Sequence, residues 1–140
     1  MGAWGVDSWG NDTALDWLEE FEKDAASSVQ QVLQEAMSCE SQLLTDTCCR
    51  GLAAAEVLAA SFQMPGKGLP DVVRDWAAAH PRSISRSLLA TAIAVVATVD
   101  RNSELQELWD ANGRNEDWHA SNDDLLGRLR SIESLWDQER

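Results

Sequence analysis

Apolar residues recur along most of the chain at spacings of three and four, the spacing of one face of an α-helix. The first such stretch follows Asn11, a good capping residue, and Asp12, which suits the positive end of the helix dipole. Its apolar positions are Ala14, Trp17, Leu18 and Phe21. A shorter second helix is predicted over residues 28–38. Its inward positions are expected to be Val29, Val32, Leu33 and Met37.

The middle of the chain is expected to supply most of the core. Residues 47–62 form an Ala-rich predicted helix that neighbouring helices can approach closely, and the loop at 65–68 ends it. Another helix opens at Pro70, and Pro81 breaks the chain again. One side of that helix carries Leu69, Val72, Val73 and Trp76. Residues 85–100 are apolar nearly all round, which predicts a buried helix.

The last third of the chain predicts two further helical segments. Residues 103–106 form a capping-box pattern that opens a helix, and Asn112-Gly113 ends it. Its inward positions are expected to be Leu105, Leu108 and Trp109. The final segment has an apolar face made of Trp118, Leu125, Leu129, Ile132 and Trp136. Residues 121–124 could restart a helix, so one long helix and a broken pair both fit the pattern.

Together these segments predict an all-α fold, a compact bundle of six to seven helices over residues 11–140. Residues 1–10 contain two Trp and three Gly without periodicity, which predicts an irregular arm docked on the outside through Trp4 and Trp9. A length of 140 residues and an apolar fraction of 44% suit a single domain, residues 1–140, that needs no metal or disulfide for its core. The helices at 47–62 and 85–100 are expected to be central.

The net charge of the chain limits the kinds of molecule that it is expected to bind. Acidic residues outnumber basic ones by 24 to 11, and the net charge of −13 is concentrated in residues 1–24 and 100–140, each with a net −6. This acidity argues against binding to nucleic acid or to an anionic membrane, and permits a basic protein partner. The same acidity would also be expected of a protein in which it serves only to maintain solubility. The start lacks the pattern of a signal peptide, and Cys48 and Cys49 are adjacent, which favours reduced thiols and a cytoplasmic location.

One row of carboxylates stands out on the first predicted helix. The row is Asp12, Asp16, Glu20 and Asp24, flanked by Glu19 and Glu22. Residues four apart are neighbours on a helix surface, and Lys23 is placed to offset only Glu19. Three interpretations are open: solvent screens the row, an Arg from elsewhere pairs with it, or it attracts a cationic partner.

Glu56 is the only charged residue between Arg50 and Lys67, within an Ala-rich stretch. If buried, its carboxylate needs a partner. The structural interpretation is an anchor that accepts hydrogen bonds from backbone N–H groups or from a Trp indole of the arm. The functional interpretation is a general base or a ligand-binding group, but no second catalytic group is identifiable nearby.

Motifs for metal, phosphate or nucleophilic chemistry are incomplete. The single Glu-x-x-His at 116–119 falls short of the two that a di-iron bundle needs, and Cys48-Cys49 lacks zinc-ligand spacing. Gly66-Lys67-Gly68 lacks the rest of a P-loop, and no Gly-x-Ser-x-Gly occurs. We therefore expect no metal, no cofactor and no catalytic residue.

The opening Met1-Gly2-Ala3-Trp4-Gly5, then Trp9 and Asn11-Asp12-x-Ala14-x-Asp16-Trp17, resembles a bacterial family known as domain of unknown function 4259. Its members look like short acidic proteins that begin Met-Gly-Ala/Thr-Trp-Gly. The stretch around Glu56 and Glu107-Leu108-Trp109 also resemble it, whereas residues 7–10 depart from its Gly-Pro-Phe and acid. The resemblance implies a bacterial, helical single domain and carries over no catalytic residue.

These observations lead to three hypotheses of function. The first is a non-enzymatic cytosolic interaction protein, such as an acidic immunity-type inhibitor that masks a basic partner, for instance a nuclease. Its partner-binding residues would be Asp12, Asp16, Glu19, Glu20 and Asp24. The second is a small-ligand-binding protein or enzyme with a pocket between the arm and the bundle, around Trp4, Trp9 and Glu56. The third is a structural or stress-related domain.

Overall fold

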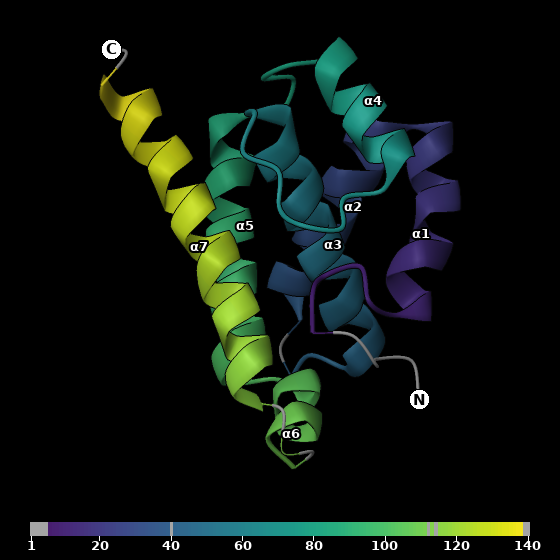
Figure 1. Ribbon diagram of the computed structural model, residues 1–140, viewed down its shortest axis with the longest axis vertical. Helices are drawn as coiled ribbons and strands as arrows, with labels where there is room; N and C mark the ends of the chain where they lie inside the picture. The colour runs from purple at the N-terminus through teal and green to yellow at the C-terminus, as the bar shows by residue number, and fades with distance from the viewer. Residues whose placement is uncertain (1–5, 40, 112, 114, 139–140) are drawn as a thin grey trace.

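A computed structural model of the chain describes residues 6–39, 41–111, 113 and 115–138. Its helices are α1 (Asp12–Lys23), α2 (Ala25–Ser38), α3 (Thr45–Ser61), α4 (Asp71–Ala79), α5 (Arg86–Arg101), α6 (Glu104–Ala111) and α7 (Asn115–Gln138). The predicted all-α bundle is therefore confirmed, and α7 is one continuous helix. In Figure 1, α7 runs along one side of the molecule, α1 lies on the opposite side, and α6 closes the lower end.

The core is centred on α3, where every residue from Gly51 to Ser61 is buried. A Cβ atom added to Gly51 would lie only 3.0 Å from Val95 Cγ1, so small residues on α3 allow α5 to approach closely. The prediction that α5 is buried nearly all round is wrong, because Ala90 and Thr98 are exposed. Exposing a small or hydroxyl-bearing side chain to water costs little free energy, so one face of α5 can remain exposed to solvent.

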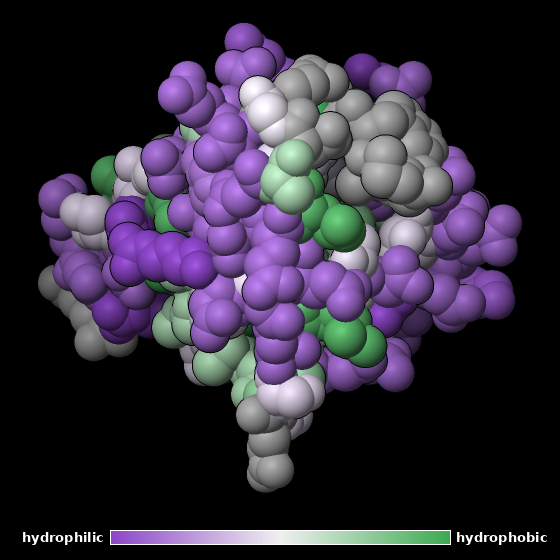
Figure 2. Space-filling model, turned by 90° about the horizontal axis from the view of Figure 1, so that it is seen from below, coloured by the Kyte–Doolittle hydropathy of each residue, from purple (hydrophilic) through white to green (hydrophobic). Residues whose placement is uncertain are grey.

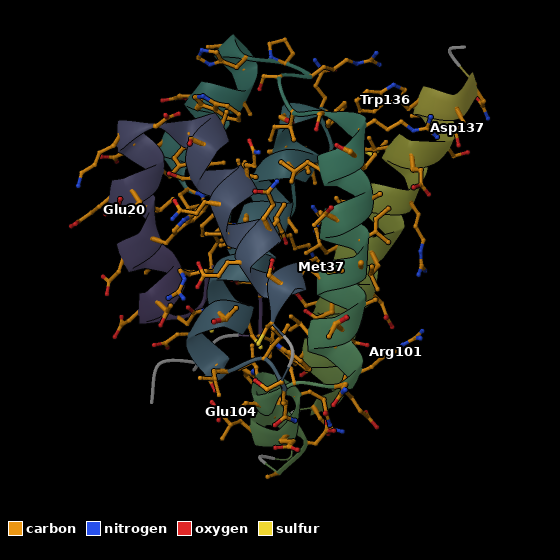
Figure 3. All side chains as sticks on the ribbon, turned by 180° about the vertical axis from the view of Figure 1, so that it is seen from behind. Glu20, Met37, Arg101, Glu104, Trp136 and Asp137 are labelled. Carbon is orange, nitrogen blue, oxygen red and sulfur yellow. The ribbon has the colours of Figure 1, made fainter. Side chains whose placement is uncertain are left out.

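Two residues predicted to face inward lie at the surface. Met37 in the last turn of α2 is 50% exposed, and Leu108 on α6 is 48% exposed. Met37 lies beside α5 on the outside of the bundle (Figure 3). α6 has only two turns, and Leu105 and Trp109, four residues apart, already bury its inward face. Leu108 lies outside that contact.

The start of α3 depends on a residue far along the chain. Glu104 Oε1 accepts hydrogen bonds from Thr45 N at 2.9 Å and from Thr45 Oγ1 at 2.6 Å. These bonds lower the pKa of the Glu104 carboxyl. Because the cap comes from α6, α3 begins two residues earlier than its own sequence predicts. The Ser103 hydroxyl caps α6 as predicted, accepting from Gln106 N at 3.0 Å.

Asn11 caps α1 as predicted, since its buried Oδ1 accepts from Ala14 N at 2.7 Å. Replacing Asn11 by Ala leaves an N–H group of α1 without its acceptor, so we expect the free energy of unfolding to fall by about 1 kcal/mol. Urea unfolding followed by circular dichroism measures the change. Asn11→Ser keeps a capping oxygen and is the control. Equal stability of both variants and the parent would contradict the role of this cap.

The surface at the end of the molecule that carries α6 is mostly hydrophilic, with separate apolar patches (Figure 2). Within the described residues, no helix combines the length and the apolar character needed to cross a bilayer.

Candidate functional site

The outer surface of α1 carries most of the predicted partner-binding residues. Asp12, Asp16, Glu19, Glu20 and Glu22 are all exposed. Leu15, at 44% exposure, shares their side of the helix. We call these six residues the acidic face of α1. Trp17 and Phe21 anchor the opposite side in the core, so the acidic face must point away from the bundle, as Glu20 does in Figure 3.

Charge on the acidic face is poorly compensated. In the described residues the ion pair on this helix joins Lys23 Nζ to Glu20 Oε1 at 3.6 Å, so the predicted pairing of Lys23 with Glu19 is wrong. No Arg from another described element forms an ion pair with the face. Asp24 differs from the rest of the row, because it ends α1 and caps α2 by accepting from Ser27 N at 3.4 Å.

The arm, α3 and α7 meet at Glu56, whose side chain is 5% exposed. Arg128 on α7 binds it with both ends of its guanidinium: Nη1 donates to Oε1 at 2.8 Å and Nη2 to Oε2 at 3.1 Å. The Ser8 hydroxyl of the arm donates to Oε2 at 3.0 Å. Three segments far apart in the sequence therefore share one carboxylate.

Arg128 also binds two further groups, donating from Nε to Asp124 at 2.9 Å and from Nη1 to the Met64 carbonyl at 3.1 Å. Burial alone would lower the pKa of Arg128, but the bonds and charges of Glu56, and then of Asp124, outweigh it and raise that pKa. Gly66 lies directly against this pair. A Cβ atom there would lie 2.7 Å from Arg128 Nη2 and 2.8 Å from Glu56 Oε1.

Glu56 is thus an anchor, but its predicted partners are wrong. Arg128 and Ser8 bind it, not a backbone N–H group or an indole. The Trp9 indole N–H is buried without a hydrogen-bond partner in the described part of the chain. Trp9 itself is only 5% exposed, so this part of the arm packs into the bundle and not merely on its outside. Trp4 lies outside the described residues.

A cleft of about 450 Å³ opens beside this ion pair. It is lined by Val6, Asp7, Glu56, Lys67, Asp117, Ala120, Ser121, Asp124 and Arg128. Residues of the arm and of the bundle line this cleft together next to Glu56, but Trp9 does not line it. Because Glu56 already accepts three hydrogen bonds, its carboxylate is not free to act as a general base.

A second polar junction joins α5, α6 and α7 at His119. Its Nδ1 lies 2.6 Å from Asp100 Oδ1, and its Nε2 lies 3.0 Å from Asp110 Oδ1. Burial works against a charged imidazole, but the two carboxylates outweigh it and raise the pKa of His119. Sequence reasoning weighed this residue only as a metal ligand with Glu116. The carboxylates that bind it come from two other helices, which no local motif shows.

A family model described as Domain of unknown function (DUF4259) matches residues 2–121. The chain belongs to this family. No curated protein matches the chain, and no solved structure matches it. The family resemblance predicted from the opening motif is therefore confirmed, while a bacterial origin stays a prediction. The matched residues include α1, Glu56 and His119, whereas Arg128 and the second half of α7 lie beyond them.

The thiols of this DUF4259 domain do not provide a nucleophile in its core. Burial raises the pKa of Cys48 and raises that of Cys49 to about 12, so both thiols stay protonated near neutral pH. In the chain outside residues 1–5, 40, 112, 114 and 139–140, no three His, Cys, Asp or Glu side chains are placed to hold a metal ion.

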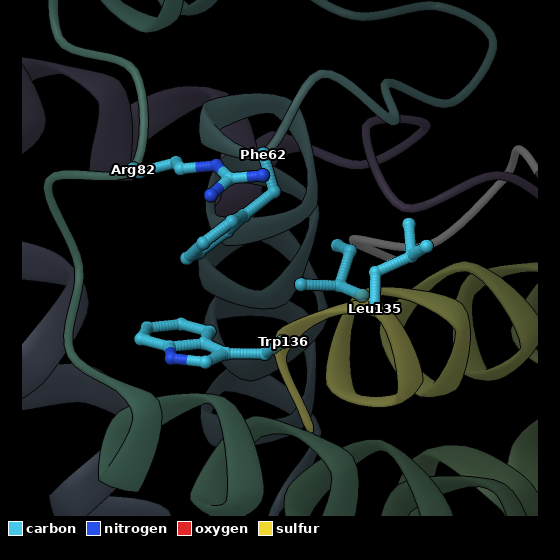
Figure 4. Close-up of a pocket in the computed structure, with 5 residues that line it drawn as sticks. Phe62, Arg82, Leu135 and Trp136 are labelled. Atoms are coloured by element: carbon cyan, nitrogen blue, oxygen red, sulfur yellow. The ribbon is translucent and has the colours of Figure 1, made fainter. Parts of the chain in front are cut away.

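A small, mostly apolar pocket of the DUF4259 domain lies near the end of α7 (Figure 4). Its volume is about 150 Å³, and its walls are Phe62, Arg82, Ile132, Leu135 and Trp136. The rings of Phe62 and Trp136 are 5.1 Å apart and tilted by 45°. This contact joins the end of α3 to α7, and it lies apart from both the acidic face and the Glu56 cleft.

Proposed function

We propose that this domain is a non-enzymatic interaction module that binds a basic protein through the acidic face of α1. One observation carries the proposal: five exposed carboxylates share one side of α1 with an exposed Leu15, and Lys23 is the one cation of α1. Like charges four residues apart cost an isolated helix about 0.2–0.5 kcal/mol per pair. A cationic partner surface would relieve that repulsion on binding.

The chemistry of the face suits fast, salt-sensitive association. A surface of one sign attracts an oppositely charged partner over about a Debye length, which raises the association rate. Leu15 supplies an apolar contact that becomes buried, and the carboxylates beside it supply the charge. An acidic immunity-type inhibitor that masks a basic enzyme, such as a nuclease, is the concrete form of this proposal. The free thiols support a cytoplasmic setting as part of it.

Reversing Asp16 and Glu20 to Lys is expected to slow association with the native partner at least about tenfold, because it changes the charge of the face by four units. Proteins that co-purify with the parent domain at low salt supply the partner, and surface plasmon resonance at rising salt measures the rate. The partner is expected to be basic and to dissociate more readily as salt increases.

The matched control reverses Glu116 and Asp123, two exposed acids on α7, on the opposite side of the molecule (Figure 1). It changes the net charge equally but leaves the acidic face intact, so binding should fall much less. Equal loss of binding in both variants would reduce the proposal to a general effect of net charge. Full binding by the Asp16 and Glu20 variant would refute it.

The Glu56 cleft favours a second candidate function, binding of a small polar ligand. Its volume falls in the range of small-molecule sites, and Asp7, Lys67 and Asp117 line it. Native mass spectrometry of the purified protein checks for such a ligand. A bound small molecule lost on Asp117→Ala, but retained when Asp16 and Glu20 are reversed, would favour this candidate over the interaction module.

A further inference from the structure

The His119 junction has a geometry that requires a charged imidazole. Both ring nitrogens face carboxylate oxygens, Nδ1 toward Asp100 and Nε2 toward Asp110. A carboxylate can only accept, so both nitrogens must carry a proton to form both bonds. A neutral imidazole has one N–H, and its other nitrogen would point a lone pair at a carboxylate. Loss of the proton therefore breaks one of the two bonds.

The contacts around the ring show which bond is weaker. Asp100 is held in place, since its side chain is 12% exposed and also accepts from Asn122 Nδ2 at 3.1 Å. Asp110 is 38% exposed and is bound by Gln106 of its own helix and by the Asn115 side chain at the start of α7, both near the surface. The bond to Asp100 is also the shorter one. We therefore expect the neutral imidazole to keep its N–H on Nδ1 and to lose Asp110.

Asp110 lies near the end of α6, which is only eight residues long. A helix of two turns is not stable by itself and depends on its tertiary contacts. Next to Asp110, the Trp109 ring stacks on Trp118 of α7, with centroids 6.2 Å apart, and Trp118 meets the His119 ring edge-on at 4.9 Å. The His119–Asp110 bond therefore ties the end of α6 to α7 beside an indole pair.

We propose that the protonation of His119 controls how firmly the C-terminal half of α6 is held against α7, so that this corner of the bundle is a pH-sensitive latch. The charged groups that act on the imidazole in the described chain are Asp100 from α5 and Asp110 from α6. On α7 the Trp118 ring meets the imidazole, and the exposed carboxylates of Glu116 and Asp123 lie three residues before it and four residues after it. This device is independent of the acidic face of α1.

The direction of the response follows from linkage. The folded protein raises the pKa of His119 above the value of about 6.5 in an unfolded chain. The stabilising contribution is therefore complete below about pH 6.5 and is lost as the pH rises through the folded pKa. Alkaline conditions loosen the latch, and acidic conditions down to the titration of the carboxylates keep it closed.

Hydrogen exchange of the α6 amides, corrected for the intrinsic effect of pH on exchange, tests the latch at about pH 6 and about pH 9. The opening equilibrium of α6 is expected to rise about tenfold for each unit by which contact with Asp110 raises the pKa of His119. Nuclear magnetic resonance of the His119 ring gives that pKa independently. His80, which directly follows α4 at the other end of the molecule, is the reference ring (Figure 1).

Two variants separate the latch from general loss of stability. His119→Gln removes the titrating group. The opening equilibrium of α6 should then change between the two pH values no more than that of the other helices. Asp110→Asn removes one carboxylate, and the pKa of His119 should drop while α6 opens more at low pH. The proposal is overturned if His119→Gln retains the pH response of α6, or if Asp110→Asn leaves the pKa of His119 unchanged.

Discussion

Replacing Glu56 by Ala is expected to lower the free energy of unfolding by about 3 kcal/mol, near the lower end of the range for breaking a buried ion pair. The loss arises because Arg128, 16% exposed, keeps its charge but loses its principal partner, retaining only Asp124 and the Met64 carbonyl. Ser8 loses its acceptor as well, which weakens the attachment of the arm. For a domain of this size the melting temperature should fall by roughly 10 °C.

Thermal and urea unfolding measure this change, with Asp123→Ala as the control. Asp123 is an exposed acid on α7, so its removal should alter stability by no more than about 0.5 kcal/mol. The double variant Glu56→Leu, Arg128→Met replaces the pair with apolar side chains of similar size and should recover most of the loss. Unchanged melting of Glu56→Ala would contradict the anchor role.

Replacing Gly66 by Ala is expected to cost about 1–3 kcal/mol, the usual range for inserting atoms into a packed site. The added methyl group would lie closer than 3.0 Å to an atom of both Glu56 and Arg128. The guanidinium must shift to make room, and its two parallel bonds to Glu56 weaken. The sequence marks this glycine only as a loop residue, so its role emerges from the packing of the loop against α7.

Gly127→Ala is the matched control because the same atoms are added in open space. Apart from the adjacent residues and the backbone of α7 itself, no atom lies within 4 Å of the new Cβ, so Ala should raise stability by roughly 0.5–1 kcal/mol. Opposite signs for these two glycine variants in urea unfolding would support the packing of Gly66 against the ion pair. A Gly66→Ala variant as stable as the parent would show that the pair adapts without cost.

Local sequence patterns predicted the helices, but they did not predict which residues from distant parts of the chain bind one another. The apolar spacing on α1 and the cap at Asn11 are properties of a dozen neighbouring residues, and the structure confirms both. The bond between Arg128 and Glu56 spans 72 positions, and that between Glu104 and Thr45 spans 59. No short-range periodicity contains such information.

One signal for the Glu56 partner was present in the sequence. Arg128 lies three residues after Leu125 and directly before Leu129, on the edge of the buried stripe of α7. A long cationic side chain at such an edge can reach inward while its stem packs on apolar surface. Met37 and Leu108 show the opposite case, since both fit an apolar pattern yet about half of each side chain is exposed at the surface of the bundle.

The acidic row on α1 was predicted from the sequence only in part. Spacing placed its members on one side of α1, but the sequence left open whether an Arg from elsewhere would pair with them, and the structure shows them exposed. The sequence did not reveal that Asp24 would leave the row to cap α2. Spacing also places Leu15 beside the carboxylates, but only the structure shows that its side chain is 44% exposed, which makes this side of α1 a candidate binding face.

Site-specific crosslinking from Leu15 tests the proposed function most directly. A photoreactive amino acid replaces Leu15 in the full chain, and a matched one replaces Ala120, an exposed residue on α7. In the cells that produce the protein, position 15 is expected to crosslink to a basic protein, the adduct should decline with added salt after lysis, and position 120 should not form it. Absence of that adduct at position 15, or equal crosslinking from both positions, would contradict binding through the acidic face of α1.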